Sequence, residues 1–241
     1  FQPIEVLKPF LIIILATILC DIKSNILFKY LISIFLISFI SLLLIAQPDI
    51  GQTLLVIFCW AVLIFTSGIN IYILLAIFIA GASLLTYLII YVPRFDYIQG
   101  RIFSFFNRET GTHNFQSDKA IESITSGGFF GKGIGEGVLK NRVPEAHTDY
   151  IISVISEEFG VVAIMLILLL FLILIYMVFK KISFETNDKA KLILIGSISL
   201  ILMQATIHIG VNIRLFPTTG MTLPFLSYGG SSIISTSILA G

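Results

Sequence analysis

Long apolar runs alternate with short polar segments along most of the chain. Apolar runs of about 20 residues are long enough to cross a bilayer as helices, and they occur at residues 4–19, 26–46, 50–68, 71–93, 150–179 and 190–212. A seventh apolar run begins near Ser231 and stops at Gly241. The pattern predicts an all-α polytopic membrane protein in which residues 1–241 form a single transmembrane domain. Because the chain starts at Phe1 and stops inside an apolar run, we expect a fragment of a longer protein.

The composition agrees with a membrane protein. The chain is 57% hydrophobic and 12% charged, and its net charge is +1. A soluble domain carries more charge on its surface, and a net charge of +1 implies no surface for a polyanion over the chain as a whole. The two cysteines, Cys20 and Cys59, are far apart, and they indicate neither a disulfide framework nor a metal site.

The lysines between the apolar runs predict the orientation in the membrane. Residues 21–29 and 180–191 carry six lysines and fall on one side by helix parity, and that side should be cytoplasmic. The turn at 47–52 and the long segment 94–148 fall on the opposite side. The sequence therefore predicts a large extracytoplasmic loop, and loops of this length usually carry function.

Two features stand out within this loop. Residues 116–126 place apolar side chains at helical spacing and predict a short amphipathic helix that ends at Gly127 and Gly128. Glycines then recur at short intervals up to Gly137, which indicates closely approached or unusually bent backbone. The loop ends in Pro144-Glu145-Ala146-His147-Thr148-Asp149 and runs directly into an apolar segment.

These motifs, in this order, resemble the SEDS family, which comprises the FtsW, RodA and SpoVE groups. The resemblance covers nearly the whole chain, and Ala146 is typical of the FtsW group. It rests on Gln2-Pro3 with Glu5, Gln47-Pro48-Asp49, Asn114-Phe115-Gln116, Ser126-Gly127-Gly128 with Gly131-Lys132-Gly133, the segment 144–149, Glu157-Glu158-Phe159-Gly160, and Leu223-Pro224-Phe225-Leu226-Ser227-Tyr228-Gly229-Gly230-Ser231-Ser232.

The resemblance implies a SEDS-type bundle of ten helices, of which this chain would lack the first three and most of the last. It also implies a peptidoglycan glycosyltransferase that polymerises lipid II at the outer face of a bacterial cytoplasmic membrane, in cell division. The implied transfer is inverting, with undecaprenyl diphosphate as leaving group. The implied partners are lipid II, membrane lipid, a class B penicillin-binding protein and other division proteins.

Such a transfer needs a general base and groups that stabilise the leaving diphosphate. Asp149 is the candidate base, because it lies where external water, a headgroup-level substrate and a helix start coincide. The alternative is that Thr148 or Asp149 only caps the following helix. Asp49 has the same two interpretations, since it follows Pro48 and precedes an apolar run. Both carboxylates together could hold a divalent cation against the diphosphate. The sequence does not decide whether a metal ion is required.

Other polar residues of the external side are candidates for substrate binding. The basic residues suit a diphosphate, although a solvated loop charge is the default for each one. Glu145 and His147 flank Asp149, and two residues of the irregular segment 217–232 would line a cavity or support the next helix. The full set of substrate-binding candidates is Asp49, Arg101, Lys132, Lys140, Arg142, Glu145, His147, Ser227 and Tyr228.

Three acidic residues near the helix starts favour structural roles. Glu157 lies deeper along the helix than Asp149, and Glu158 faces nearly the opposite way, so one substrate hydroxyl could hardly be served by both. We expect buried groups that pair with other helices, and the alternative is that either glutamate tunes the site. Glu5 and Lys8 are three residues apart on one helical face and predict a local ion pair.

A lipid II flippase is the alternative function, because carboxylates within membrane helices are also features of transporters. The ionisable groups gather at one external face, however, whereas alternating access requires a site near the midplane. A scaffold that only recruits division proteins would not explain Asp149 beside His147 and several basic groups. The sequence therefore favours the enzyme.

Overall fold

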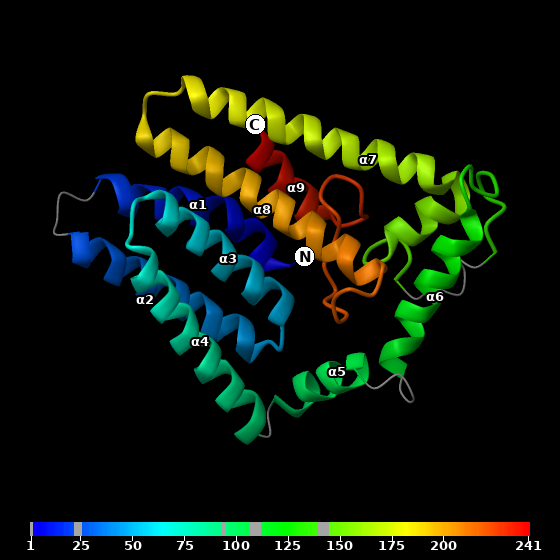
Figure 1. Ribbon diagram of the computed structural model, residues 1–241, viewed down its shortest axis with the longest axis horizontal. Coiled ribbons are helices and arrows are strands. Elements are labelled where there is room, and N and C mark those ends of the chain that lie inside the picture. The colour runs from blue at the N-terminus through cyan, green and yellow to red at the C-terminus, as the bar shows by residue number, and fades with distance from the viewer. Residues whose placement is uncertain (1, 22–25, 93–94, 107–111, 139–144) are drawn as a thin grey trace.

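The computed structural model describes residues 2–21, 26–92, 95–106, 112–138 and 145–241. Within these ranges every regular element is a helix (Figure 1). The helices are α1 (Pro3–Asp21), α2 (Ile26–Ala46), α3 (Ile50–Thr66), α4 (Ile71–Tyr91), α5 (Asp96–Phe106), α6 (Thr112–Gly127), α7 (Ile151–Phe184), α8 (Asp188–Asn212) and α9 (Gly230–Ala240). The helices α1, α2, α4, α7 and α8 are long and apolar enough to cross a membrane, and α3 and α9 are shorter apolar helices. The prediction of an all-α polytopic membrane protein is confirmed.

Helix α8 lies at the centre of the bundle and packs against α1, α3, α6, α7 and α9. Its neighbours α1 and α3 also contact each other, and side chains such as Leu15, Leu63 and Leu200 are fully buried between these helices. The outer helices α2, α4 and α7 instead expose large apolar side chains, for example Phe35, Ile79 and Met165. Apolar side chains that face outward are stable in lipid, so these exposed surfaces mark the membrane-facing side of the bundle.

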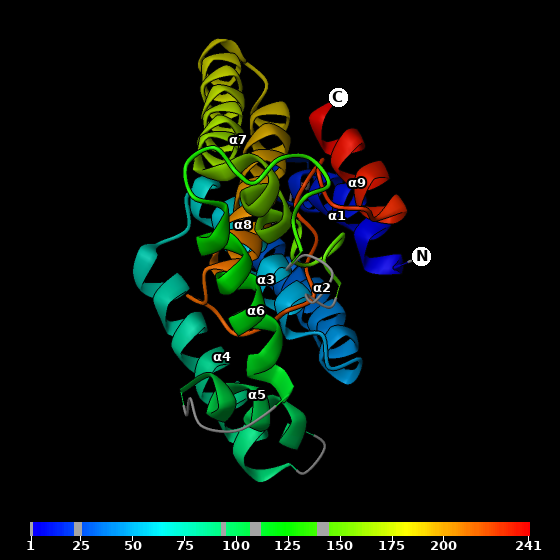
Figure 2. The same cartoon turned by 90° about the vertical axis from the view of Figure 1, so that its right-hand side faces the viewer.

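The predicted external loop contains two helices where the sequence predicted one. Helix α6 confirms the predicted amphipathic segment and is longer than expected, while α5 was not predicted. The two helices run around the rim of the bundle from the end of α4 to the start of α7 (Figures 1 and 2). Helix α6 packs against α7 and α8, so much of this external segment has regular structure.

Helix α7 is not one straight span, as the sequence suggested for residues 150–179. Gly160 has φ 76° and ψ −172°, which interrupts the helix and divides it into a short external half and the long half 161–184. Positive φ favours glycine, because a Cβ atom would clash with its own backbone. The change of direction occurs at the end of α7 that lies beside α6 (Figure 1).

Candidate functional site

The kink in α7 is filled by the glycine loop, which we define as residues 128–138. The N–H groups of Val161 and Val162 donate to the carbonyls of Gly128 and Phe129 at 3.0 and 3.3 Å. In return, the N–H groups of Lys132 and Gly133 donate to the carbonyls of Glu157 and Glu158 at 2.9 and 3.1 Å. These four bonds give partners to the N–H groups of residues 161 and 162 and to the carbonyls of residues 157 and 158, which flank the kink.

Glycines make this close approach possible. A Cβ atom at Gly131 would lie 2.1 Å from the carbonyl oxygen of Glu158, and one at Gly160 would lie 2.2 Å from that of Phe129. Gly131 also has φ 78°. The sequence-based expectation of closely approached backbone therefore holds at these positions.

The two deeper glutamates bind this loop and α6. Glu157 is fully buried, accepts a hydrogen bond from the Ser123 hydroxyl at 3.1 Å, and pairs with the Lys132 ammonium at 3.4 Å. Glu158 is half-buried and accepts from the Gly135 N–H at 3.1 Å. The structural role is thus supported for Glu157, whereas Glu158 is less buried than expected and binds loop backbone. The candidate Lys132 lies beside Glu157.

Asp149 lies in a tight turn that precedes α7, and the backbone holds it there. Its N–H donates to the Glu145 carbonyl at 3.1 Å, and its own carbonyl accepts from the Asn212 side-chain amide at 3.0 Å. The N-cap of α7 is Tyr150, and no side chain caps this helix. Among the described residues, none donates a hydrogen bond to the Asp149 carboxylate. The capping alternative for Asp149 is therefore not what the structure shows.

The surroundings of the Asp149 carboxylate raise its pKa to about 6. Partial burial is the main cause, the negative charge of Glu145 adds to it, and the positive charge of Arg101 opposes it. The carboxylate also lies against the irregular segment 217–229, because a Cβ atom at Gly220 would be 3.5 Å from its Oδ2. A carboxylate with this pKa is ionised at neutral pH and basic enough to accept a proton from a hydroxyl group in a transition state.

Asp49 lies at the start of α3 and is bound on both carboxylate oxygens. Oδ1 accepts from the N–H of Gln52 at 3.1 Å, which makes Asp49 the N-cap of α3, and Oδ2 accepts from the side-chain amide of Gln2 at 3.1 Å. Burial raises the pKa of Asp49, while the hydrogen bond from Gln52 lowers it. The capping role predicted as one alternative for Asp49 is thus confirmed.

Arg101 links the two carboxylates electrostatically. It projects from α5 and donates to the carbonyl of Thr218 at 3.0 Å. Burial lowers the pKa of Arg101, and the charges of Asp49 and Asp149 both raise it. The external helix α5, the α2–α3 turn and the start of α7 therefore bring these three charged groups into one region. This cluster is the candidate site.

The remaining candidates differ in what their atoms contact. The hydroxyl of Ser227 is buried, donates to the Thr148 carbonyl at 2.7 Å and accepts from the Leu223 N–H at 2.8 Å, so it joins two chain segments. The N–H of Tyr228 donates to the His147 carbonyl at 2.9 Å, while the Tyr228 side chain is 81% exposed. Glu145 and His147 are exposed. Lys140 and Arg142 lie outside the described residues.

A stripe of polar residues on α8, which sequence reasoning missed, holds this region in place. Gln204 donates to the Thr222 carbonyl at 3.0 Å, and His208 Nδ1 donates to the Met221 carbonyl at 2.7 Å. Asn212 donates to the Asp149 carbonyl, as above, and all three side chains are buried. Their spacing of four residues puts them on one face of the helix. This spacing within an apolar run could have identified the three residues from the sequence.

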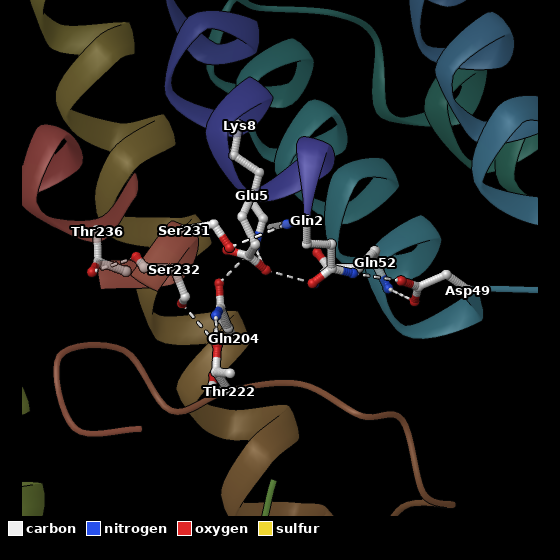
Figure 3. A network of polar contacts seen from close by, with 10 residues as sticks. All are labelled: Gln2, Glu5, Lys8, Asp49, Gln52, Gln204, Thr222, Ser231, Ser232 and Thr236. Carbon is white, nitrogen blue, oxygen red and sulfur yellow. Dashed lines mark hydrogen bonds and ion pairs between the residues drawn. The ribbon is translucent and has the colours of Figure 1, made fainter. Parts of the chain in front are cut away.

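A second network extends from this stripe through the bundle (Figure 3). The Lys8 ammonium donates to Glu5 at 2.7 Å and to the Gln204 side chain at 2.9 Å, and the Gln52 side chain donates to Glu5 at 2.7 Å. The predicted Glu5–Lys8 ion pair is therefore present, and it is fully buried and ties α1 to α3 and α8. Gln2 and Gln52 both also bind Asp49, so the network reaches the candidate site.

The described residues contain no group of three or more His, Cys, Asp and Glu side chains placed to hold a metal ion. Among the described residues, Asp49 and Asp149 are the two carboxylates whose charges act on Arg101.

A family model described as a cell cycle protein, for FtsW, RodA and SpoVE, matches residues 1–241. Two curated relatives are probable peptidoglycan glycosyltransferases FtsW. The relative from Caulobacter vibrioides is 34% identical, and the match covers 100% of this chain and 61% of the relative. The relative from Enterococcus hirae is 32% identical over 100% of this chain and 64% of its own length. The chain thus spans about three fifths of the relatives that it matches.

Two solved structures resemble the fold over the whole chain. A chain of a peptidoglycan synthase complex superposes with a TM-score of 0.77 at 26% identity, and the match covers 67% of that chain. The rod shape determining protein RodA of Thermus thermophilus superposes with a TM-score of 0.65 at 28% identity, with 62% of that chain covered. Both matches support the helix arrangement described above.

Proposed function

Because the chain belongs to the family of cell cycle proteins that comprises FtsW, RodA and SpoVE, we propose that the complete protein is a peptidoglycan glycosyltransferase. Its substrate is lipid II, and it works at the outer face of the bacterial cytoplasmic membrane in cell division. The names of the curated relatives support the reaction class. The observation that carries the proposal is a half-buried Asp149 carboxylate, with a pKa of about 6, that accepts no hydrogen bond from the described residues.

The proposed chemistry is an inverting glycosyl transfer with Asp149 as general base. Asp149 accepts the proton of a sugar hydroxyl, whose oxygen attacks the anomeric carbon of the lipid-linked donor. The bond from that carbon to the diphosphate breaks, and undecaprenyl diphosphate leaves with the bonding electrons. A base of this pKa is well matched to proton transfer at neutral pH.

Arg101 is the described cation best placed to stabilise the leaving diphosphate. Its charge acts on both Asp49 and Asp149, and its hydrogen bond to the Thr218 carbonyl fixes the side chain on the irregular segment 217–229. A guanidinium forms strong charge-assisted hydrogen bonds with phosphate oxygens. Lys132 is a weaker candidate for this role, because it already pairs with Glu157.

The proposed partner is a class B penicillin-binding protein, which would cross-link the strands that this protein makes. One structural relative is a chain of a peptidoglycan synthase complex that coordinates polymerisation and crosslinking. Other division proteins and membrane lipid complete the proposed set of partners.

The test is reconstitution of the full-length protein with its penicillin-binding partner and purified lipid II. We expect glycan strands from the native protein and none from Asp149→Ala, while both proteins show the same elution profile and the same helical circular dichroism. Normal polymerisation by Asp149→Ala would refute the base assignment. Movement of lipid II across vesicles without polymerisation would instead identify a flippase.

A further inference from the structure

The glycine loop carries four highly exposed apolar side chains on the external side. Phe129, Phe130 and Ile134 are 75%, 84% and 78% exposed, and Val138 is 61% exposed. Four large apolar side chains on one short loop are unfavourable in water, and such patches usually mark a contact with lipid or protein. Backbone bonds, described above, fix the loop to α7, so these side chains cannot simply turn inward.

The height of this loop follows from its bonds to α7. Phe129 and Gly128 are bonded to Val162 and Val161, which begin the long half of α7. That half runs to residue 184, which is roughly 36 Å at about 1.5 Å per residue and slightly more than the hydrocarbon thickness of about 30 Å. Its far end carries Lys180 and Lys181, which belong on the cytoplasmic side. The glycine loop therefore lies at the external boundary of the hydrocarbon region.

The loop is also continuous with a lipid-facing surface. On either side of the kink, Phe159 and Val162 are 43% and 51% exposed, and further along the long half of α7 Met165 and Leu166 are 62% and 56% exposed. Figure 2 shows the loop, in bright green, crossing the end of α7. The charge of Lys132 does not oppose this placement, because its ammonium pairs with buried Glu157. The other charged side chain of the loop, Glu136, is exposed and belongs on the water side of the anchor.

From this placement we propose that the glycine loop is a membrane anchor, with Phe129 and Phe130 inserted at the headgroup level of the outer leaflet. Aromatic side chains are enriched at this level of membrane proteins, and apolar side chains that enter it bind a membrane surface. Bilayer lipid is the proposed contact of these side chains. The loop continues the exposed surface of the long half of α7, and this surface is apolar and long enough to span a bilayer. The anchor holds the kink, and with it the short half of α7, at a fixed height. This inference does not depend on the proposed enzymatic function.

The experiment places a tryptophan at the tip of the anchor. Full-length Phe130→Trp protein is reconstituted in phosphatidylcholine and phosphatidylglycerol bilayers, and the fluorescence of the parent protein, which already contains Trp60, is subtracted. Lipids brominated at shallow or deep acyl positions and aqueous iodide serve as quenchers. Phe129→Trp is a second reporter, and Glu136→Trp on the same loop is the matched control, because Glu136 is exposed and charged.

We expect the Phe130→Trp difference signal to be quenched at least twofold by shallowly brominated lipid and weakly by iodide, with the reverse for Glu136→Trp. Quenching of Phe130→Trp and Phe129→Trp by iodide alone would overturn the proposal, because the loop would then lie in water. Quenching by neither agent would also overturn it, because another protein segment would then cover the loop. None of these readouts requires activity.

Discussion

Asp49 and Asp149 both stand at the external start of an apolar helix, yet the structure uses them differently. Asp49 gives one oxygen to the N–H of Gln52 and the other to the side chain of Gln2. Asp149 is held through its backbone, by the Glu145 carbonyl and the Asn212 amide, and its carboxylate accepts nothing from the described residues. The Asp49 carboxylate stabilises a helix end. The Asp149 carboxylate is held in position by its backbone, and its oxygens accept no hydrogen bond from the described residues.

This difference favours Asp149 over Asp49 as the proposed general base. A hydrogen bond from a backbone N–H stabilises the ionised form of a carboxylate and lowers its pKa, as Gln52 does for Asp49. Asp149 has no such donor among the described residues, and burial and the charge of Glu145 raise its pKa to about 6. The sequence positions of the two residues look alike, and the hydrogen bonds distinguish them.

The largest expected effect is on polymerisation by Asn variants of the two residues. Asp149→Asn should lose at least about 100-fold in rate, because general base catalysis typically contributes that much or more. Asp49→Asn should lose much less, since asparagine is also a good N-cap. The rates are measured as lipid II consumed by the reconstituted complex. Equal losses in the two variants would show that Asp49 takes part in the chemistry as directly as Asp149.

The pH profile of polymerisation should report Asp149 alone. Below a pH of about 6 the carboxylate is protonated and cannot accept a proton, so the rate should fall about tenfold per pH unit on the acidic side. Asp49→Asn should keep the same midpoint, because it leaves Asp149 and its neighbours in place. A midpoint near the ordinary carboxyl pKa of about 4 would mean that the titrating group is not a desolvated Asp149.

The fold was largely predictable from the sequence, because an apolar run long enough to span a bilayer specifies a helix by itself. The kink at Gly160 was not, because it depends on a loop whose residues precede it by about thirty positions and replace the broken helical bonds. Helix α5 was also missed, since its short stretch mixes charged residues and glycine with apolar ones.

The sequence allowed the residues of the candidate site to be named, but it did not show which of them lie close together. Asp49, Arg101 and Asp149 come from distant parts of the sequence, and only the fold shows that the charge of Arg101 reaches both carboxylates. Asn212 was overlooked because one polar residue near the end of an apolar helix has many explanations. With Gln204 and His208 at four-residue spacing, it forms a face that the sequence does display.

The two carboxylates should also affect thermal stability with opposite signs. The pKa of Asp149 is raised above its ordinary value of 3.8, so the folded state binds the proton more tightly than the unfolded state. Ionisation of Asp149 therefore costs stability as the pH rises from about 4 to about 6, by at most about 3 kcal/mol. At pH 7.5, Asp149→Asn should raise the melting temperature, whereas Asp49→Ala should lower it by losing a cap worth about 1 kcal/mol.

The melting temperatures of the detergent-solubilised proteins, measured at pH 7.5 and pH 5, test the expected increase for Asp149→Asn and the expected decrease for Asp49→Ala. The gain from Asp149→Asn should shrink at pH 5, because the native carboxyl group is then mostly protonated as well. The loss from Asp49→Ala should persist at both pH values. Stabilisation by Asp149→Asn that does not depend on pH would contradict the explanation by burial of a charge.

The smallest expected effect is on the pH midpoint of polymerisation in variants of Arg101, whose charge interacts with both Asp49 and Asp149. Its charge lowers the pKa of Asp149, so Arg101→Gln should move the acidic midpoint of polymerisation upward, and Arg101→Lys should restore much of the native midpoint by retaining the charge. Both variants lose the guanidinium that donates to the Thr218 carbonyl and that is proposed to bind the diphosphate. A decrease in maximal rate shared by the two would therefore report the lost guanidinium and not the charge. An unchanged midpoint in Arg101→Gln would mean that solvent screens Arg101 from Asp149. The burial of the carboxylate would then set its basicity without help from the cation.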